Sequence, residues 1–301
     1  MKKIKTLKLI FGFVFFSTIS IAQDITTDFN YFPKVEYNAT IAESNTSKNG
    51  TTFEKIVIDG FDSKVPFYLI KPKDKNDNKF VILLHGVTGS KDDWVNPTSS
   101  LSEKYVKLKD SLLTLGYAVI IPDAKYHGER SYEGNFASPI TFFSSQDVQK
   151  ISNLYTTTTK DIRIIMDYIE FTSKNKSIAF DIVGYSMGGQ MTIFLNSVDD
   201  RLNRIVVCVA ALDFKIVGMR LGLSEENTKL IEFASPKNYA TLQKAPIALF
   251  MGTKDGWYTK EEAQDFFDKI TIKGKSIKFY ESGHYLPDEF INDVIESLIK
   301  K

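Results

Sequence analysis

The sequence of 301 residues has few of the side chains that bind metals or form disulfides. It contains one cysteine, Cys208, and three widely separated histidines, His85, His127 and His284. Cys208 lies in an apolar stretch, where a thiol is usually buried and inert. The sequence has no His-Glu-x-x-His motif, no Cys/His cluster and no cofactor motif. We therefore expect no metal, no cofactor and no internal disulfide.

The chain also lacks a strong excess of charge, an internal repeat and a Pro-rich or Ser-rich linker. Its 38 basic and 37 acidic residues give a formal net charge of +1 at pH 7. This balance gives no electrostatic reason to bind nucleic acid or an anionic membrane, so we expect no nucleic-acid partner. The absence of a linker favours one large domain.

The N-terminal segment has the pattern of a secretory signal peptide. Four lysines within the first eight residues precede an apolar run over 9–21 and the small residues Ser20 and Ala22. The alternative is a membrane anchor, but the run is shorter than the roughly 20 residues that a spanning helix needs. We expect a signal peptide over 1–22, a single domain over 23–301, and a secreted or periplasmic protein without stable membrane insertion after cleavage.

Strand-like runs alternate with helical patterns along most of the chain. The expected strands are 53–59, 65–70, 80–84, 118–121, 178–183, 205–210, 247–251 and 276–280, and the expected helices are 101–115, 147–171, 190–196, 260–270 and 287–299. From residue 80 onward the strands are apolar nearly throughout, which is typical of parallel strands covered on both faces. Residues 60–64 read as a hairpin turn between the first two strands. The pattern predicts an α/β fold whose sheet begins antiparallel and becomes parallel.

Two segments, 124–146 and 213–242, interrupt the alternation of strands and helices. Long insertions in an α/β domain often form lids or substrate walls. Several aromatic residues could line an acyl or sugar site or pack in the core: Trp94, Tyr126, Tyr132, Phe136, Phe142, Phe143 and Trp257.

One serine lies between glycines, after a strand-like run and before a helical one. The segment is Gly184-Tyr185-Ser186-Met187-Gly188. This pattern is that of a nucleophile elbow, a tight turn that exposes the serine side chain to a base and a substrate. Glycines two residues before and after the serine permit the crowded backbone of such a turn.

The elbow and the order of the elements resemble the α/β-hydrolase superfamily from about residue 53 to the C-terminus. The resemblance implies an α/β-hydrolase fold, with a mostly parallel, twisted, eight-stranded sheet, helices on both faces and lid-like insertions. Within the superfamily the sequence looks most similar to the branch of dienelactone hydrolases and prolyl-oligopeptidase-like enzymes, which includes exported esterases of acylated carbohydrates. The features that suit this branch are the elbow with Gly189 and the segment Asp199-Asp200-Arg201-Leu202.

The resemblance also implies an oxyanion hole. The apolar run over 81–84 leads into His85-Gly86, as the family's strand leads into its oxyanion loop. By this match the backbone N–H groups of Val87 and Met187 would hold the oxyanion of a tetrahedral intermediate. His85 would fix the loop rather than carry protons.

The same family order implies a catalytic triad. His284, in the loop after the last expected strand, would take the proton of Ser186 and return it to the leaving group. Asp255, after the penultimate strand, would orient His284, although a turn residue is the alternative explanation of this aspartate. Asp213 lies where some family members carry the acid instead.

Residues 121–130 look like a further loop of the family, with one extra residue and Tyr126 in place of a glycine. The resemblance implies that Asp123, His127 and Arg130 support the loop internally, with contact between substrate and His127 or Arg130 as the alternative.

The sequence as a whole predicts a secreted serine hydrolase that cleaves carboxylic esters through an acyl-enzyme on Ser186. Its substrate would be a small-molecule ester or an acyl group on a carbohydrate. The alternatives are a serine peptidase of small peptides and a catalytically silent binding protein with the same fold. The pattern leaves the acyl preference and the oligomeric state open.

Overall fold

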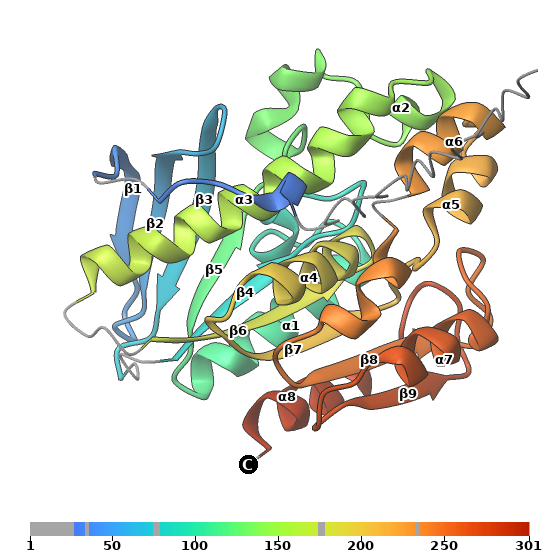
Figure 1. The fold of residues 1–301 in the computed structure, drawn as a ribbon. Coiled ribbons are helices and arrows are strands. Elements are labelled where there is room, and N and C mark those ends of the chain that lie inside the picture. Colours follow the sequence, from blue (N-terminus) through green and yellow to red (C-terminus); the bar gives the residue numbers. More distant parts are fainter. Residues whose placement is uncertain (1–26, 34–35, 75–78, 174–177, 233–234, 301) are drawn as a thin grey trace, which may run out of the picture.

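A nine-stranded sheet forms the centre of the computed structural model (Figure 1). The structure describes residues 27–33, 36–74, 79–173, 178–232 and 235–300. The predicted signal peptide over 1–22 lies outside the described residues. The strand order in the sheet is β1-β2-β3-β5-β4-β6-β7-β8-β9.

The sheet is antiparallel at its N-terminal edge and parallel elsewhere. The pairs β1–β2, β2–β3 and β3–β5 are antiparallel, and every pair from β5–β4 to β8–β9 is parallel. Asp59 pairs with Lys64 across the turn between β2 and β3, which confirms the predicted hairpin. The strands are β1 (Ala39–Thr46), β2 (Thr52–Asp59), β3 (Lys64–Lys71), β4 (Lys79–Leu84), β5 (Ala118–Pro122), β6 (Ala179–Tyr185), β7 (Leu202–Cys208), β8 (Ile247–Gly252) and β9 (Ser276–Tyr280).

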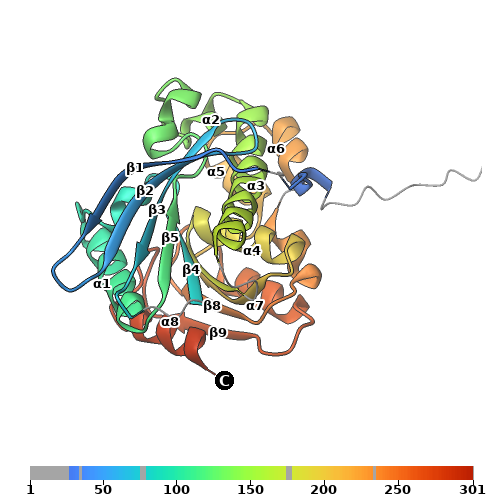
Figure 2. The same ribbon diagram turned by 90° about the vertical axis from the view of Figure 1, so that its left-hand side faces the viewer.

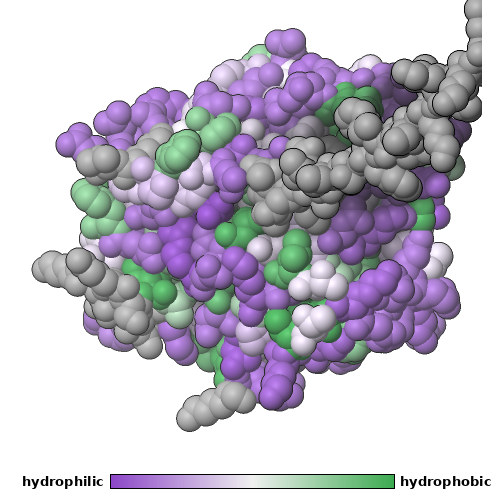
Figure 3. All heavy atoms as spheres, viewed as in Figure 1, coloured by the Kyte–Doolittle hydropathy of each residue, from purple (hydrophilic) through white to green (hydrophobic). Residues whose placement is uncertain are grey.

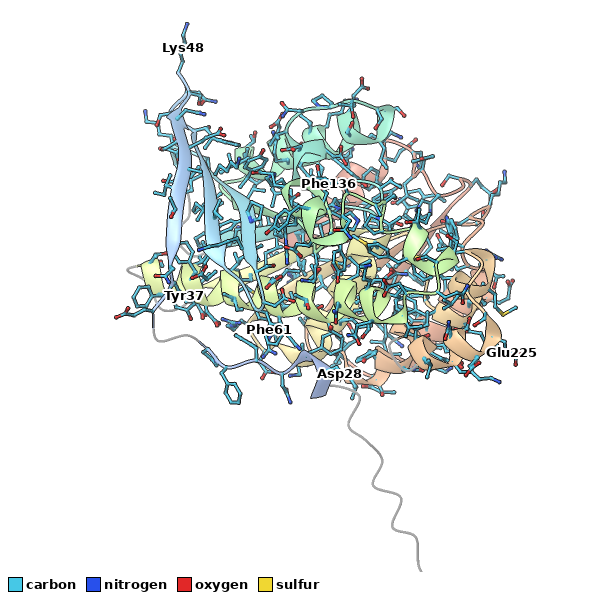
Figure 4. The ribbon with its side chains drawn as sticks, turned by 90° about the horizontal axis from the view of Figure 1, so that it is seen from above. Asp28, Tyr37, Lys48, Phe61, Phe136 and Glu225 are labelled. Atoms are coloured by element: carbon cyan, nitrogen blue, oxygen red, sulfur yellow. The ribbon has the colours of Figure 1, made fainter. Side chains whose placement is uncertain are left out.

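Strand β1 is the strand that the sequence pattern did not predict, and it raises the number of strands from eight to nine. Seven of its eight residues are exposed, and it forms the edge of the sheet. An edge strand needs no apolar face, so its sequence carries no alternation to recognise. Figure 4 shows Lys48 at the tip of the hairpin between β1 and β2, away from the body of the molecule.

Helices cover both faces of the sheet, as predicted (Figure 2). One face carries α1 and α8, which contact each other, and the other carries α3, α4 and α7. The bounds of these helices are α1 (Ser100–Thr114), α3 (Val148–Thr172), α4 (Met187–Val198), α7 (Lys260–Lys269) and α8 (Phe290–Ile299). The strands between these layers are apolar because neither face reaches solvent. Strands β5 and β8 are buried at every residue.

The two predicted insertions lie against each other beside the sheet (Figure 1). The first contains the 3₁₀ segment η3 (Gly128–Gly134) and α2 (Thr141–Ser144), and the second contains α5 (Phe214–Arg220), α6 (Glu225–Glu232) and η4 (Pro236–Leu242). Gln146 joins them, because its side-chain amide donates to the Gly222 carbonyl at 2.7 Å and its Oε1 accepts from the Ser224 N–H at 2.8 Å. This contact places both insertions around one region of the surface.

The face shown in Figure 3 is mostly hydrophilic, with small and separate apolar patches. No helix in the described part of the chain combines the length and the apolar character needed to cross a membrane.

Candidate active site

Ser186 lies at a sharp turn between the end of β6 and the start of α4. Its backbone has φ 56° and ψ −116°, a conformation that costs free energy in any residue other than glycine. The Ser186 N–H donates to the Cys208 carbonyl at 2.8 Å, so the strained turn is fixed to the neighbouring strand β7. The geometry is that expected of a nucleophile elbow, with a half-buried serine at its tip.

Two glycines make this turn possible because there is no room for a side chain at either position. A Cβ on Gly184 would lie 2.1 Å from the Gly188 carbonyl oxygen, and a Cβ on Gly188 would lie 2.5 Å from the Leu84 carbonyl oxygen. Both separations are far below van der Waals contact. The glycines therefore let the first turn of α4 approach β4 and β6 closely.

The structure brings the three predicted triad residues together. The Nε2 atom of His284 lies 2.9 Å from Oγ of Ser186, and its Nδ1 atom lies 2.8 Å from Oδ2 of Asp255. The three residues come from three separate loops at the carboxyl ends of β6, β8 and β9. With a proton on Nδ1, a neutral His284 donates to Asp255 and accepts from the serine hydroxyl.

The side chain of Asp255 is shielded from water beside His284, whereas the alternative acid, Asp213, bonds to other residues. The Asp255 side chain has no exposed surface, and its Oδ1 accepts from the Trp257 N–H at 2.9 Å. Asp213 caps the start of α5 by accepting from the Lys215 N–H, and it pairs with Lys237 at 2.7 Å. The carboxylate that contacts the histidine is therefore that of Asp255.

The two predicted oxyanion donors line the same cavity as Ser186. Met187 is the first residue of α4, so its N–H is among those that a helix cannot satisfy internally. The Val87 N–H makes no backbone hydrogen bond to another described residue. Both positions are thus chemically suited to donate to an oxyanion.

His85 holds the peptide group that carries the Val87 N–H. Its Nδ1 lies 2.8 Å from the Gly86 carbonyl oxygen, which also accepts from the Gly89 N–H at 3.0 Å. Because a trans peptide is planar, fixing this carbonyl fixes the direction of the Val87 N–H on the opposite side. The Nε2 of His85 accepts from the Ala124 N–H at 3.2 Å, so Nδ1 carries the proton.

Burial keeps His85 neutral. Its side chain is removed from water, and this desolvation lowers the pKa of His85 to about 4. At neutral pH the ring therefore donates to Gly86 from Nδ1 and accepts at Nε2, and it does not act as a proton carrier.

His127 supports the oxyanion loop through a contact with the carbonyl group of Val87. Its Nε2 lies 2.8 Å from the Val87 carbonyl oxygen, and its Nδ1 lies 2.8 Å from the Lys125 carbonyl oxygen. Two carbonyl acceptors favour a charged ring, but burial is the larger effect and lowers the pKa of His127 to about 4. A neutral His127 donates to only one of the two carbonyls.

Asp123 and Arg130 lie in a buried polar network beneath this loop. Asp123 accepts from the Lys91 N–H at 2.9 Å and pairs with the Lys91 ammonium at 3.0 Å. Arg130 is fully buried and pairs with Asp161 at 2.8 Å and with Glu133 at 2.9 Å. Neither residue, nor His127, lines the cavity beside Ser186. Their positions match the predicted supporting role rather than the alternative of substrate contact.

A cavity of about 230 Å³ opens beside Ser186 and His284. Both insertions contribute walls to it, through Ile140 and Phe143 from the first and Val217 and Leu221 from the second. A larger hollow of about 800 Å³ lies between the β1–β2 hairpin and the end of α1, but it contains none of the three triad residues.

The aromatic residues singled out in the sequence divide into three groups. Phe143 and Trp257 line the cavity beside Ser186. Trp94, Tyr126 and Phe142 are buried in the core. Tyr132 and Phe136 are exposed, and Figure 4 labels Phe136 on the first insertion.

The walls of the cavity are mainly apolar and include no Asp, Glu, Lys or Arg side chain. Two buried polar side chains on the wall are paired: the Tyr155 hydroxyl donates to Gln190 Oε1 at 3.0 Å, and Gln190 Nε2 donates to the Ala211 carbonyl at 2.8 Å. Such a site binds an uncharged group by burying apolar surface.

Sequence reasoning missed the part played by Tyr185. Its hydroxyl donates to the His284 carbonyl at 2.7 Å and accepts from the Leu286 N–H at 3.0 Å. A residue between Gly184 and Ser186 carries no signal for partners about a hundred positions away. Among the described residues, no group of three His, Cys, Asp or Glu side chains is arranged to bind a metal.

Solved structures that share this fold include several esterases. Acetyl xylan esterase 1 from Thermoanaerobacterium sp. JW/SL YS485 superposes with a TM-score of 0.68 at 15% identity, over 88% of each chain. A cold-adapted esterase from an Arctic intertidal metagenomic library gives a TM-score of 0.63 at 14% identity, over 86% of this chain and 98% of the other. An esterase of Pyrococcus furiosus gives 0.55 at 20% identity, over 89% and 95%. These superpositions show that the chain has the α/β-hydrolase fold.

No curated protein matches the chain. The model of the dienelactone hydrolase family matches residues 65–285, which is more than half of the sequence and includes the elbow, Asp255 and His284. The protein therefore belongs to the dienelactone hydrolase family and is a hydrolase of carboxylic esters.

Proposed function

We propose that the protein hydrolyses uncharged carboxylic esters through an acyl-enzyme on Ser186. His284 is the general base and Asp255 orients it. The observation that carries the proposal is the continuous contact from the buried Asp255 carboxylate through His284 to the Ser186 hydroxyl, at 2.8 and 2.9 Å, beside an apolar cavity.

The reaction begins when Ser186 Oγ attacks the ester carbonyl and its proton moves to His284 Nε2. The Val87 and Met187 N–H groups donate to the oxyanion, and Asp255 stabilises the charged imidazole. Collapse of the tetrahedral intermediate breaks the bond to the alcohol, which leaves with the proton from His284. Water then attacks the acyl-enzyme with His284 again as the base, and this step releases the acid and restores Ser186.

The shape and chemistry of the cavity favour a short, uncharged group of the substrate. About 230 Å³ is below the usual size of a pocket that encloses a drug-sized ligand, so the cavity favours a small acyl group. Tyr285 lies at the mouth and is 67% exposed, next to His284 in sequence. We propose that the alcohol part of the ester is a carbohydrate and that it remains at this mouth. The acetyl xylan esterase structure is a further reason to test acylated sugars.

We also propose that the protein acts outside the cytoplasm, in the periplasm or after secretion. The support is the order of charged, apolar and small residues over 1–22. N-terminal sequencing of protein recovered from the exported fraction tests this proposal. A mature N-terminus near Gln23 agrees with it, and an intact protein that remains in the cytoplasm contradicts it.

The reaction is tested by steady-state kinetics on matched substrates, namely p-nitrophenyl acetate, an acetylated xylo-oligosaccharide and an aminoacyl p-nitroanilide. Turnover of the two esters with loss of about 10⁶ in kcat in Ser186→Ala supports the proposal. Turnover of the anilide alone identifies a peptidase instead. A folded protein that hydrolyses none of these esters, and whose Ser186→Ala variant behaves identically, contradicts the proposal.

A further inference from the structure

We propose that Tyr185 is a positioning residue that holds the segment carrying the base against the nucleophile through its side-chain hydroxyl. Tyr185 is joined by a peptide bond to Ser186, and its hydroxyl makes one hydrogen bond with His284 and one with Leu286. The inference rests on the proposed roles of Ser186 and His284.

The two hydrogen bonds of the hydroxyl are complementary. It donates to the His284 carbonyl oxygen at 2.7 Å and accepts from the Leu286 N–H at 3.0 Å. Its donor and one acceptor position are thus both used. The two contacts flank Tyr285, so the hydroxyl fixes the backbone on either side of one exposed residue.

Few other contacts hold this backbone. Before the base, the Lys254 N–H donates to the Ser282 carbonyl at 2.9 Å. From His284 to Leu286, no backbone–backbone hydrogen bond occurs between described residues. The backbone of Leu286 also accepts from the Lys104 ammonium at 2.7 Å, but a lysine side chain is a flexible anchor. The Leu286 side chain is buried in the core and so holds the end of the segment by packing. Of the two side chains that hydrogen-bond the backbone of 284–286, Tyr185 is therefore the rigid one.

The ring of Tyr185 is itself immobilised, so its hydroxyl is a fixed point. The side chain is 2% exposed and makes edge contacts with the rings of Tyr105, Phe290 and His284, at centroid distances of 5.3, 6.1 and 6.2 Å. Burial raises the pKa of Tyr185 well above its usual range, so the hydroxyl keeps the proton that it donates to His284.

This arrangement has a consequence for catalysis. The rings of His284 and Tyr185 touch, and the backbone of His284 is bonded to the side chain of the residue next to Ser186. A displacement of the elbow is thereby transmitted to the base. The separation of His284 Nε2 and Ser186 Oγ is 2.9 Å, which is within the range that proton transfer requires, and a base that moves with the elbow keeps this separation.

The test is Tyr185→Phe, which removes the hydroxyl and keeps the ring. Because misplacement of a catalytic group by about 1 Å costs up to about 100-fold, we expect kcat on p-nitrophenyl acetate to fall by roughly 10-fold to 100-fold, with little change in KM. The rate of labelling of Ser186 by a fluorophosphonate falls with kcat. The proton NMR signal of His284 Nδ1–H, which reports its bond to Asp255, shifts or broadens.

Tyr117→Phe is the matched control. Tyr117 is also buried and its hydroxyl also donates to a fixed partner, Asp181 at 3.0 Å, but it does not line the cavity beside Ser186. We expect this variant to keep kcat per folded molecule and the His284 signal, whatever stability it loses. A Tyr185→Phe protein with kcat within about twofold of the original, an unchanged His284 signal and normal labelling overturns the proposal.

A measurement on the unaltered protein covers the case in which Tyr185→Phe does not fold. The Leu286 amide is bonded to Tyr185, so its hydrogen exchange should be slow, as in protected core segments. Rapid exchange of this amide overturns the proposal. Ser186→Ala keeps the two proposals separate: activity that survives in Ser186→Ala contradicts the proposed function, whereas loss in Ser186→Ala with full activity in Tyr185→Phe contradicts only the role of Tyr185.

Discussion

The Nδ1 atom of His284 lies 2.8 Å from Oδ2 of Asp255, whose side chain has no surface exposed to water. In a dry environment the carboxylate has no competing solvent, so it fixes both the orientation and the tautomer of the imidazole. This pair is the basis for distinguishing between the two candidate acids.

Asp255→Asn is expected to lower kcat by roughly 10⁴, because an amide no longer stabilises the charged imidazole and can impose the wrong tautomer. Asp213→Asn is the control, since Asp213 bonds Lys215 and Lys237 instead. We expect the control to change kcat by less than about threefold. Steady-state kinetics on one p-nitrophenyl ester compares the two, and a larger loss in Asp213→Asn would falsify this assignment.

His85 should affect catalysis through the Gly86–Val87 peptide and not through proton transfer. Replacing it with alanine removes the hydrogen bond to the Gly86 carbonyl, so the Val87 N–H loses its direction. We expect kcat to fall by about 10-fold to 100-fold. This loss does not exceed the loss of about 100-fold to 1000-fold in kcat that follows removal of a whole oxyanion donor. His85→Asn, which can restore a donor near Nδ1, should recover much of this loss. Equal activity in the alanine and asparagine variants would argue against the positioning role.

His85 should also make the protein less stable in acid. Burial lowers the pKa of His85 to about 4 in the folded protein, whereas an unperturbed histidine has a pKa of 6.5. Between these pH values the unfolded chain therefore binds a proton at His85 that the folded chain does not. Stability is therefore lost as the pH falls from about 6.5 towards 4, by up to about 3 kcal/mol for this residue. Urea unfolding at pH 7 and pH 4.5 measures the loss. His85→Asn should show a smaller difference between the two pH values, and an unchanged difference would contradict the prediction.

Much of the sheet could be predicted from the sequence because burial leaves a direct signal. The predicted bounds of strands β4 and β8 agree with the structure to within one residue at either end, since their apolar runs coincide with the covered part of the sheet. The bounds of β9 also agree, although Tyr280 is its one buried residue. The predicted bounds of strand β7, 205–210, are shifted relative to the observed Leu202–Cys208. The apolar run continues to Ala210, but the strand ends at Cys208 because Val209 has a φ of 45°. Helix α4 begins at Met187, three residues before the predicted start, because Gly188 and Gly189 weaken the helical pattern.

The sequence predicted which chemical groups form the candidate site, but not the contacts that hold them in place. The chain order of Ser186, Asp255 and His284 was visible in the sequence, and the structure shows which carboxylate touches the histidine. The contacts of Tyr185 and the pairing of Tyr155 with Gln190 join residues far apart in the chain. Such contacts depend on how loops pack, and no short-range pattern encodes them.

The wall of the cavity should determine the length of the acyl group. Val217 is nearly buried on α5 and faces the cavity beside Ser186, so Val217→Trp fills space that an acyl chain needs. We expect kcat/KM for p-nitrophenyl butyrate to fall by at least about 10-fold more than for the acetate. Met219→Trp is the control, on the same helix at a position that is 57% exposed. It should leave the ratio of kcat/KM for the butyrate to kcat/KM for the acetate unchanged. A similar ratio in both variants would place the acyl chain elsewhere.

The absence of charged side chains from the cavity wall predicts discrimination against charged esters. A buried carboxylate without a partner is costly. We expect p-nitrophenyl butyrate to be hydrolysed with a kcat/KM at least about 100-fold above that of the p-nitrophenyl monoester of succinic acid, which has the same chain length. Comparable rates for the two esters at neutral pH would show that a cation reaches the bound acyl group.

The most direct test of the catalytic assignment is to label the purified protein with a fluorophosphonate and locate the modified peptide by mass spectrometry. The account predicts one label on Ser186, which is lost in Ser186→Ala and slowed in His284→Gln. A label on another residue, or a folded protein that remains unlabelled while it hydrolyses p-nitrophenyl acetate, would contradict the central claim that Ser186 is the nucleophile.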